Sequence, residues 1–349
     1  MRPAGRLAGR LTGRLALTLA VTTLVPGVTA GSGHVAAQQG GPRSRPALAF
    51  VSAERAHAIS VVDLRARRVV ATIPLDARPR GIQASPDGRR VYVALSDAAP
   101  NAQGRGDAIA VVDVATRRVV ARYDAGSDPE QFAVLPSGRR LYASNEDAGT
   151  ASAIDVPSGK VVGTLVVGIE PEGVAASPDG RRVYVTSETS NTVTIIDTRA
   201  DRVVANVLVD LRPRATAFSP DGRRAYVTAE VGGSLTVLDT RTHRVLATIP
   251  LERGEGKPVG VVVSPDGRRV YVANGRANTV SVVDAATHRV VATIPVGRRP
   301  WGVALTADGR ELLTANGGSN DLSVIDLATH RVVATIPVGA GPWGIAIPR

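Results

Sequence analysis

Charged and aromatic side chains recur at two positions of a repeated motif, and these residues are the ones best suited to bind a ligand. The first position is the x of a recurrent Pro-x-Gly motif. The second lies four residues beyond an aromatic residue, or its equivalent, in the apolar run that follows. In chain order the first position holds Arg80, Glu130, Glu172, Arg214, Val259, Trp301 and Trp343. In the same order the second holds Ser96, Glu146, Glu188, Glu230, Gly275, Gly317 and Glu54.

The second to fourth repeats combine these positions into an acidic arc bounded by Arg80 and Arg214, whereas the fifth to seventh offer glycine and two tryptophans. If the repeats bring the positions together, charged groups face an aromatic surface. That arrangement suits a small polar ligand with a flat or apolar part. We therefore expect ten residues to bind such a ligand: Glu54, Arg80, Glu130, Glu146, Glu172, Glu188, Arg214, Glu230, Trp301 and Trp343.

Two other arrangements use the same residues. Glu and Arg of neighbouring repeats can pair only with each other, while the Trp rings plug the space between the repeats. Clustered carboxylates can alternatively hold Ca²⁺ or Mg²⁺, which prefer oxygen ligands, although no local segment has a dedicated metal-binding spacing. We predict no catalytic residue and no cofactor, and leave a bound Ca²⁺ or Mg²⁺ as an open alternative.

The repeat is clearest in an aspartate that ends one apolar run of each copy, at successive spacings of 50, 42, 42, 42, 45 and 42 residues. The aspartates are Asp63, Asp113, Asp155, Asp197, Asp239, Asp284 and Asp326. The copy at Pro258–Gly297 divides into four runs rich in Val, Ile, Tyr and Thr, separated by turns rich in Gly, Pro, Asn and Asp. A period near 42 with four short strands per copy is typical of β-propeller blades.

The first and last copies are incomplete in a complementary way. Residues 343–347 supply only a first strand, and residues 47–75 supply a second, third and fourth strand without a first. Together they make one mixed blade, which closes the ring through backbone hydrogen bonds and removes its exposed edges. The sequence thus predicts an all-β fold, a seven-bladed propeller with four antiparallel strands per blade, over residues 47–349.

Departures from the regular period fall on one face of the predicted ring. Residues 96–107 lengthen one hairpin between second and third strands, and residues 251–257 lengthen one loop between blades. Both belong to the face that carries the two positions described above. The opposite face consists of near-identical Ser-Pro-Asp-Gly and Asp-x-x-Thr turns, whose aspartates we expect to cap the turns by accepting backbone N–H groups.

The first 46 residues have the pattern of an exported leader. They contain no Asp or Glu, and Arg2, Arg6, Arg10 and Arg14 precede an apolar stretch at residues 15–25. We predict a signal peptide over residues 1–30, with cleavage as late as residue 37, followed by a flexible linker over residues 31–46. About eleven apolar residues are too few for a transmembrane anchor. The mature protein is expected to be periplasmic or secreted, and monomeric.

Composition excludes several classes of function. The chain has no cysteine, and therefore no disulfide, thiolate metal site or covalently attached haem. The formal net charge of +11 includes six arginines of residues 1–46, and aromatic residues are only 3% of the chain. A surface on which nucleic-acid bases stack is therefore not expected.

Several segments carry a family resemblance. Residues 264–274, Ser-Pro-Asp-Gly-Arg-Arg-Val-Tyr-Val-Ala-Asn, resemble the repeat of YVTN-type seven-bladed propellers (YncE-like). Blade-specific segments resemble the exported propeller associated with pyrroloquinoline quinone (PQQ)-dependent alcohol catabolism, from about residue 47 onward. They are residues 128–130, 144–147, 170–173, 186–189, 204–214, 317–324 and 342–344. The resemblance implies association with quinoprotein dehydrogenases, without an established activity of its own, and it does not imply PQQ binding.

Three functions are compatible with the sequence. The first is an exported non-catalytic propeller that binds a small molecule or a partner protein of the envelope or secreted fraction at the channel mouth, accessory to a quinoprotein (PQQ-dependent) alcohol oxidation system. The partner in that system would be a quinoprotein dehydrogenase. The second is an enzyme of lactonase or metal-assisted lyase type that uses the acidic arc. The third is a structural envelope or adhesion module.

Overall fold

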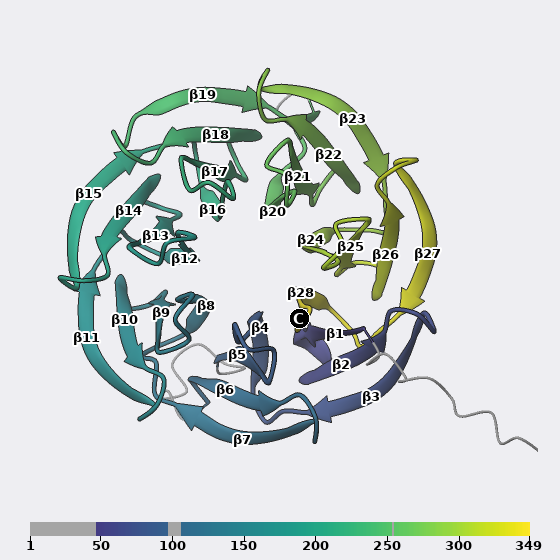
Figure 1. Cartoon of the computed structure of the whole chain (residues 1–349), viewed down its shortest axis with the longest axis horizontal. Coiled ribbons are helices and arrows are strands. Elements are labelled where there is room, and N and C mark those ends of the chain that lie inside the picture. Colours follow the sequence, from purple (N-terminus) through teal and green to yellow (C-terminus); the bar gives the residue numbers. More distant parts are fainter. Residues whose placement is uncertain (1–46, 97–105, 253–254) are drawn as a thin grey trace, which may run out of the picture. The chain divides into compact units, whose positions relative to one another are not determined.

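The protein is a ring of seven four-stranded antiparallel sheets around a central channel (Figure 1). The computed structural model describes residues 47–96, 106–252 and 255–349. The predicted signal peptide and linker lie outside the described residues, as do residues 97–105 of the lengthened hairpin and residues 253–254 of the lengthened loop. Among the described residues, no helix is long and apolar enough to cross a membrane.

Each blade runs outward from a first strand at the channel to a fourth strand at the rim (Figure 1). We number the blades by their first strands. Blade one comprises β4 (Arg78–Ala84), β5 (Arg90–Ser96), β6 (Ala108–Asp113) and β7 (Arg118–Tyr123); blade two, β8 (Pro129–Val134), β9 (Arg140–Asn145), β10 (Thr150–Asp155) and β11 (Lys160–Val166); blade three, β12 (Pro171–Ala176), β13 (Arg182–Ser187), β14 (Thr192–Asp197) and β15 (Arg202–Leu208). Blade four comprises β16 (Pro213–Phe218), β17 (Arg224–Ala229), β18 (Ser234–Asp239) and β19 (Val245–Pro250); blade five, β20 (Pro258–Val263), β21 (Arg269–Asn274), β22 (Thr279–Asp284) and β23 (Arg289–Pro295); blade six, β24 (Pro300–Leu305), β25 (Glu311–Asn316), β26 (Asp321–Asp326) and β27 (Arg331–Pro337).

Blade seven is the predicted mixed blade. Its strand order is β28 (Pro342–Ala346), β1 (Leu48–Ala53), β2 (Ala58–Asp63) and β3 (Arg68–Pro74). Phe50 lies opposite Ala346 and Val51 opposite Ile345, so segments almost 300 residues apart share one antiparallel ladder. A single 3-10 turn, η1 (Glu54–Ala56), follows β1. The predicted fold class and the closure of the ring are both confirmed.

The core lies between blades, where sheets pack face to face. Second and third strands are buried on both faces, as in β21, where Tyr271 points to one side of the sheet and Val272 to the other. Fourth strands are buried on one face only, and β23 keeps Ile294 inside while Val291 is exposed. With few aromatic residues, the interior is built mainly of Val, Ala, Ile and Leu, which pack well on pleated sheets.

The turns on the face away from the predicted site are capped by aspartates, as expected. In blade five, Ser264 Oγ donates to Asp266 Oδ1 at 2.6 Å, and Asp284 Oδ1 accepts the backbone N–H of Thr287 at 2.8 Å. These hydrogen bonds lower the pKa of Asp266 and of Asp284 because they favour the charged carboxylate.

Glycine ends the Pro-x-Gly motif in five of the seven blades, where first strands approach one another closely around the channel, whereas Gln131 and Ala215 take its place in blades two and four. A Cβ on Gly173 would lie 2.0 Å from the carbonyl oxygen of Arg214, and one on Gly302 would lie 2.4 Å from that of Trp343. Adjacent first strands thus approach backbone to backbone. In these blades the close approach places the residue before the glycine at the mouth of the channel.

Candidate ligand site at the channel mouth

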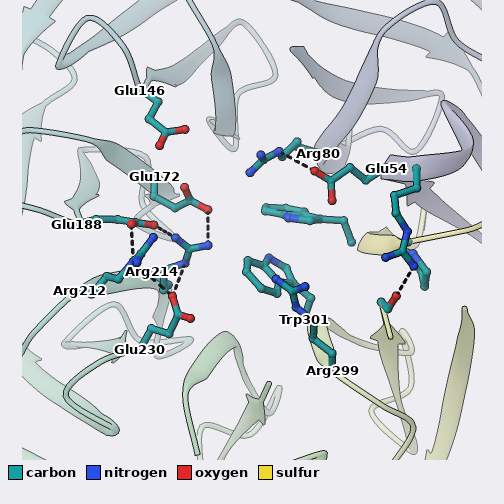
Figure 2. A pocket seen from close by; sticks show the side chains of 15 residues that line it. Glu54, Arg80, Glu146, Glu172, Glu188, Arg212, Arg214, Glu230, Arg299 and Trp301 are labelled. Atoms are coloured by element: carbon teal, nitrogen blue, oxygen red, sulfur yellow. Dashed lines mark hydrogen bonds and ion pairs between the residues drawn. The ribbon is translucent and has the colours of Figure 1, made fainter. Parts of the chain in front are cut away.

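A cavity of about 320 Å³ opens at the mouth of the channel. Nine of the ten predicted site residues line it: Glu54, Arg80, Glu146, Glu172, Glu188, Arg214, Glu230, Trp301 and Trp343 (Figure 2). The tenth, Glu130, is fully buried behind this lining. The structure therefore brings together residues of blades one to four, six and seven, as the ring of repeats predicted. Their role in ligand binding stays a prediction.

Arg214 is the hub of the acidic side. Its guanidinium pairs with Glu188, lies 3.3 Å from Glu172 and 3.6 Å from Glu230, and is only 8% exposed (Figure 2). Arg212 adds a second guanidinium, 2.6 Å from Glu188 and 3.5 Å from Glu230. Glu172 and Glu188 are almost fully buried. Part of the acidic arc is thus an ion-pair network, as the alternative interpretation of these residues anticipated.

Arg80 is the corresponding hub on the other flank. It pairs with the buried Glu130 and lies 3.4 Å from Glu54, while Arg78 lies 3.5 Å from Glu54 and 3.6 Å from Asp128. Burial by itself would lower the pKa of Arg80, but the surrounding carboxylates, Glu130 foremost, raise it above the ordinary value. Arg80 therefore stays charged although it is largely buried.

The two tryptophans form the aromatic wall of the cavity. Their ring centroids are 6.0 Å apart and the planes are tilted by 39°. The guanidiniums of Arg214 and Arg299 lie 4.9 and 5.2 Å from the Trp301 ring centroid, within cation–π distance. Trp343 also lines a second cavity of about 150 Å³ deeper in the channel. Its indole thus forms part of the floor of the mouth.

Hydroxyl groups from neighbouring blades fix the backbone of the mouth residues. Ser144 Oγ donates to the carbonyl of Glu172 at 2.8 Å, and Thr186 Oγ1 donates to that of Arg214 at 2.8 Å. Ser52 Oγ likewise donates to the carbonyl of Arg80, and Thr228 Oγ1 donates to the carbonyl of Val259. Each of these hydroxyl residues stands two places before a mouth glutamate, and alanine occupies that place in the three blades without one. This Ser/Thr-x-Glu spacing is a signal that our sequence analysis missed.

A third ring of residues also escaped the sequence analysis. It consists of the residue before each recurrent proline, namely Arg78, Asp128, Glu170, Arg212, Lys257, Arg299 and Gly341. Arg212 and Arg299 line the cavity, and so does Arg55 of η1, which donates to the carbonyl of Gly317 at 2.8 Å. Because six of the seven positions are charged, the pattern was visible in the sequence. The position of this third ring at the mouth depends on the course of the loops between blades.

Three carboxyl groups of blade two are held in their protonated form more strongly than usual. Burial raises the pKa of Glu130 well above 4.5, and the nearby Glu172 carboxylate adds to the effect. Burial and Glu172 also raise the pKa of Glu146, and burial raises that of Asp128 above 3.8. Burial outweighs the opposing effect of Arg80 on all three groups, and the following blade, which is acidic, adds Glu172 instead of an arginine.

These raised pKa values predict a pH dependence. Between the ordinary and the raised pKa the folded chain binds protons that the unfolded chain has released, so the stability contributed by Glu146 falls as the pH rises above 4.5. We expect the difference in melting temperature between Glu146→Gln and the parent to shift in favour of the variant as the pH is raised from 5 to 7.5. The measurement is thermal unfolding at both pH values with a chelator present. The prediction is contradicted if the difference in melting temperature between the two proteins is the same at both pH values. Glu311→Gln, on the opposite face, is the control.

Comparison with known proteins agrees with this architecture. The sequence model of the YNCE-like beta-propeller family matches residues 214–308 and 262–347. Over this stretch the chain is similar to the YNCE-like beta-propellers. The predicted YVTN-type resemblance is thereby confirmed, and the matched stretch holds Arg214, Glu230 and both tryptophans of the mouth. No curated protein matches the chain.

Solved structures share the propeller fold at low sequence identity. Hydrazine synthase of Kuenenia stuttgartiensis aligns with a TM-score of 0.72 and 22% identity, covering 83% of this chain and 99% of that one. A functionally unknown protein of Desulfotomaculum acetoxidans gives 0.73 and 20%, covering 86% and 98%. A putative 6-phosphogluconolactonase of Bacteroides uniformis gives 0.72 and 19%, covering 87% and 100%. At these identities the likeness concerns the fold alone.

Proposed function

We propose that this propeller is an exported, non-catalytic binding protein that holds a small polar ligand with a flat part in the mouth cavity. The observation that carries the proposal is the concentration of buried charge around one cavity of about 320 Å³. A volume of this size accommodates a small metabolite. Carboxylates and guanidiniums supply polar contacts, and the tryptophans supply a flat surface.

The energetic cost of the ion-pair network supports a binding role. Arg214, Glu172 and Glu188 are each less than 10% exposed, and burying ion pairs in this way stabilises a fold little or not at all. In blade five the equivalent positions are Val259 and Gly275, and the sheet is the same. The fold therefore does not require the charges, which favours a ligand as their purpose.

The proposal extends to the cellular location of the protein and to its partner. The basic, apolar leader at residues 1–30 supports export to the periplasm or the exterior. The resemblance to the propeller of PQQ-dependent alcohol catabolism supports an accessory role beside a quinoprotein dehydrogenase, either through a metabolite of alcohol oxidation or through the enzyme itself.

Ligand binding can be followed through fluorescence, because the two tryptophans of the chain both stand at the mouth. We expect one member of a panel of alcohols, aldehydes, carboxylates, PQQ and the cognate dehydrogenase to change this fluorescence and to bind in calorimetry. Trp301→Ala and Glu172→Gln should weaken calorimetric binding about tenfold or more, as is usual for a buried anchor.

The matched control is Glu311→Gln, a carboxylate on the opposite face that pairs with Arg67. It should bind as the parent does. Absence of binding across the panel, or equal affinity in the parent, Trp301→Ala and Glu172→Gln, would refute the proposed function.

A further inference from the structure

Three carboxyl groups of blade two converge beside the mouth. Asp128 immediately precedes β8, Glu130 lies near its start, and Glu146 follows β9. Since Pro129 lies opposite Asn145 in the ladder of these two strands, the three side chains leave the sheet at one end. One oxygen of each lies within 4.8 Å of those of the other two. Oxygens bound to one Ca²⁺ at about 2.4 Å are at most about 4.8 Å apart, so the spacing fits a shared ion.

Two buried oxygens of this cluster, one on Glu130 and one on Asp128, lack a hydrogen-bond donor among the described residues. Glu130 is fully buried, and its Oε2 accepts from Arg80, but among the described residues no N–H or hydroxyl group donates to its Oε1. The other polar group that reaches the Glu130 carboxylate is the carboxyl of Glu146. Within the described part of the chain Asp128 Oδ1 is likewise buried without a hydrogen bond, and it lies 3.6 Å from the guanidinium of Arg78. Leaving a buried carboxylate oxygen unpaired is costly. A cation beside Glu130 Oε1 would satisfy it without displacing Arg80.

In the neighbouring blade three, arginines compensate carboxylates at the corresponding positions. Blade three carries carboxylates at the same three positions, Glu170, Glu172 and Glu188, and blade four supplies Arg212 and Arg214 to the latter two. Blade two is followed by the acidic blade three, and within the described residues its three carboxylates receive cations only from Arg78 and Arg80 of blade one. Both of those arginines also serve Glu54.

Glu146 differs in this respect from Glu188, its counterpart in blade three. It makes no ion pair with any residue in the described part of the chain, and Figure 2 shows it standing apart from the two arginine networks. The cluster thus combines excess negative charge, a spacing that suits a shared ion, and a fully buried oxygen without a donor.

We propose that Asp128, Glu130 and Glu146 bind one divalent cation of the size and hardness of Ca²⁺. Carboxylate oxygens are the ligands such an ion prefers. Glu130 bridges the ion and Arg80, one oxygen to each. Glu146 lines the mouth cavity, so the ion lies at the edge of that cavity and is accessible from it. The inference goes beyond small-molecule binding and does not depend on it.

The test uses the full chain, stripped with chelator and titrated with CaCl₂ alone. We expect calorimetry to show one site per chain and the melting temperature to rise with Ca²⁺. Tb³⁺ should bind in the same place and give emission sensitised by the tryptophans that line the same cavity as Glu146, and Ca²⁺ should displace it. Asp128→Asn and Glu146→Gln, both only partly buried, should weaken Ca²⁺ binding at least about tenfold, as expected for loss of a charged ligand.

Glu170→Gln is the matched control, because it removes a carboxylate from the position in blade three that corresponds to Asp128. It should bind Ca²⁺ as tightly as the parent. The proposal is overturned if the stripped parent shows neither binding heat nor a thermal shift up to about 10 mM Ca²⁺, beyond the weakest range of protein sites. It is equally overturned if Ca²⁺ binds with unchanged affinity to Asp128→Asn and Glu146→Gln. Because no organic ligand is present, either result leaves the proposed function untouched.

Discussion

Removing residues 341–349 should open the ring and lower the melting temperature by roughly 10 °C or more. The deletion eliminates β28, its ladder with β1 and the buried Trp343. Loss of a buried Trp alone usually costs about 3–5 kcal/mol, and about 1 kcal/mol shifts the melting temperature of a large domain by roughly 2–4 °C. The deletion also uncovers β1 as an edge strand, which promotes association between chains. Thermal unfolding and size-exclusion chromatography measure both effects.

The control for this deletion is removal of Pro348 and Arg349 alone. These residues follow β28, which ends at Ala346, so the ladder with β1 remains. The shorter deletion should melt close to the parent and stay dispersed. If the longer deletion also melts as the parent does, the mixed blade does not hold the ring together.

Replacing Arg214 by Met should destabilise the propeller by about 3–5 kcal/mol, the usual cost of breaking a buried ion pair from one side. Arg214 touches carboxylates of three residues, Glu172, Glu188 and Glu230, and two of these are almost fully buried. Without the guanidinium they repel one another in a medium of low polarity. Chemical denaturation at neutral pH measures the loss, and ligand binding at the mouth should vanish with it.

A second substitution separates charge from packing. Adding Glu188→Gln to Arg214→Met removes one of the orphaned carboxylates, so the double variant should recover part of the lost stability. Arg241→Met, in an exposed turn of the same blade, should leave stability within about 0.5 kcal/mol of the parent. No recovery in the double variant would mean that Arg214 acts through packing against Trp301 rather than through charge.

Much of the fold could be predicted because its signals are local. The regular aspartates, the Pro-x-Gly motifs and the Ser-Pro-Asp-Gly turns each concern a few consecutive residues, and a strand ends where its turn chemistry begins. The mixed blade followed from the same periodicity, since residues 343–347 and 47–75 complement each other strand for strand. Nine of the ten predicted mouth residues line the cavity for the same reason: a fixed place in a repeat becomes a fixed place on a ring.

The details of the site could not be predicted from spacing alone. Glu130 and Glu172 occupy the same position of the repeat, yet Glu172 lines the cavity and Glu130 lies fully buried behind it. The difference arises from the neighbours: Arg80 holds Glu130 from the preceding blade, whereas Arg214 holds Glu172 from the following one. Arg55 and Arg299 reach the cavity from a 3-10 turn and an inter-blade loop, neither of which belongs to a strand pattern.

The sequence by itself determined the number of blades, the closure of the ring and nine of the residues around its mouth, because the periodicity of the repeat is visible in consecutive residues. Only the tertiary structure decided which charges compensate one another. Ion pairing depends on side chains that meet across blades, at distances that differ by a few ångströms between equivalent positions. The same repeat position therefore gives a neutralised carboxylate in blade three and an uncompensated one, Glu146, in blade two.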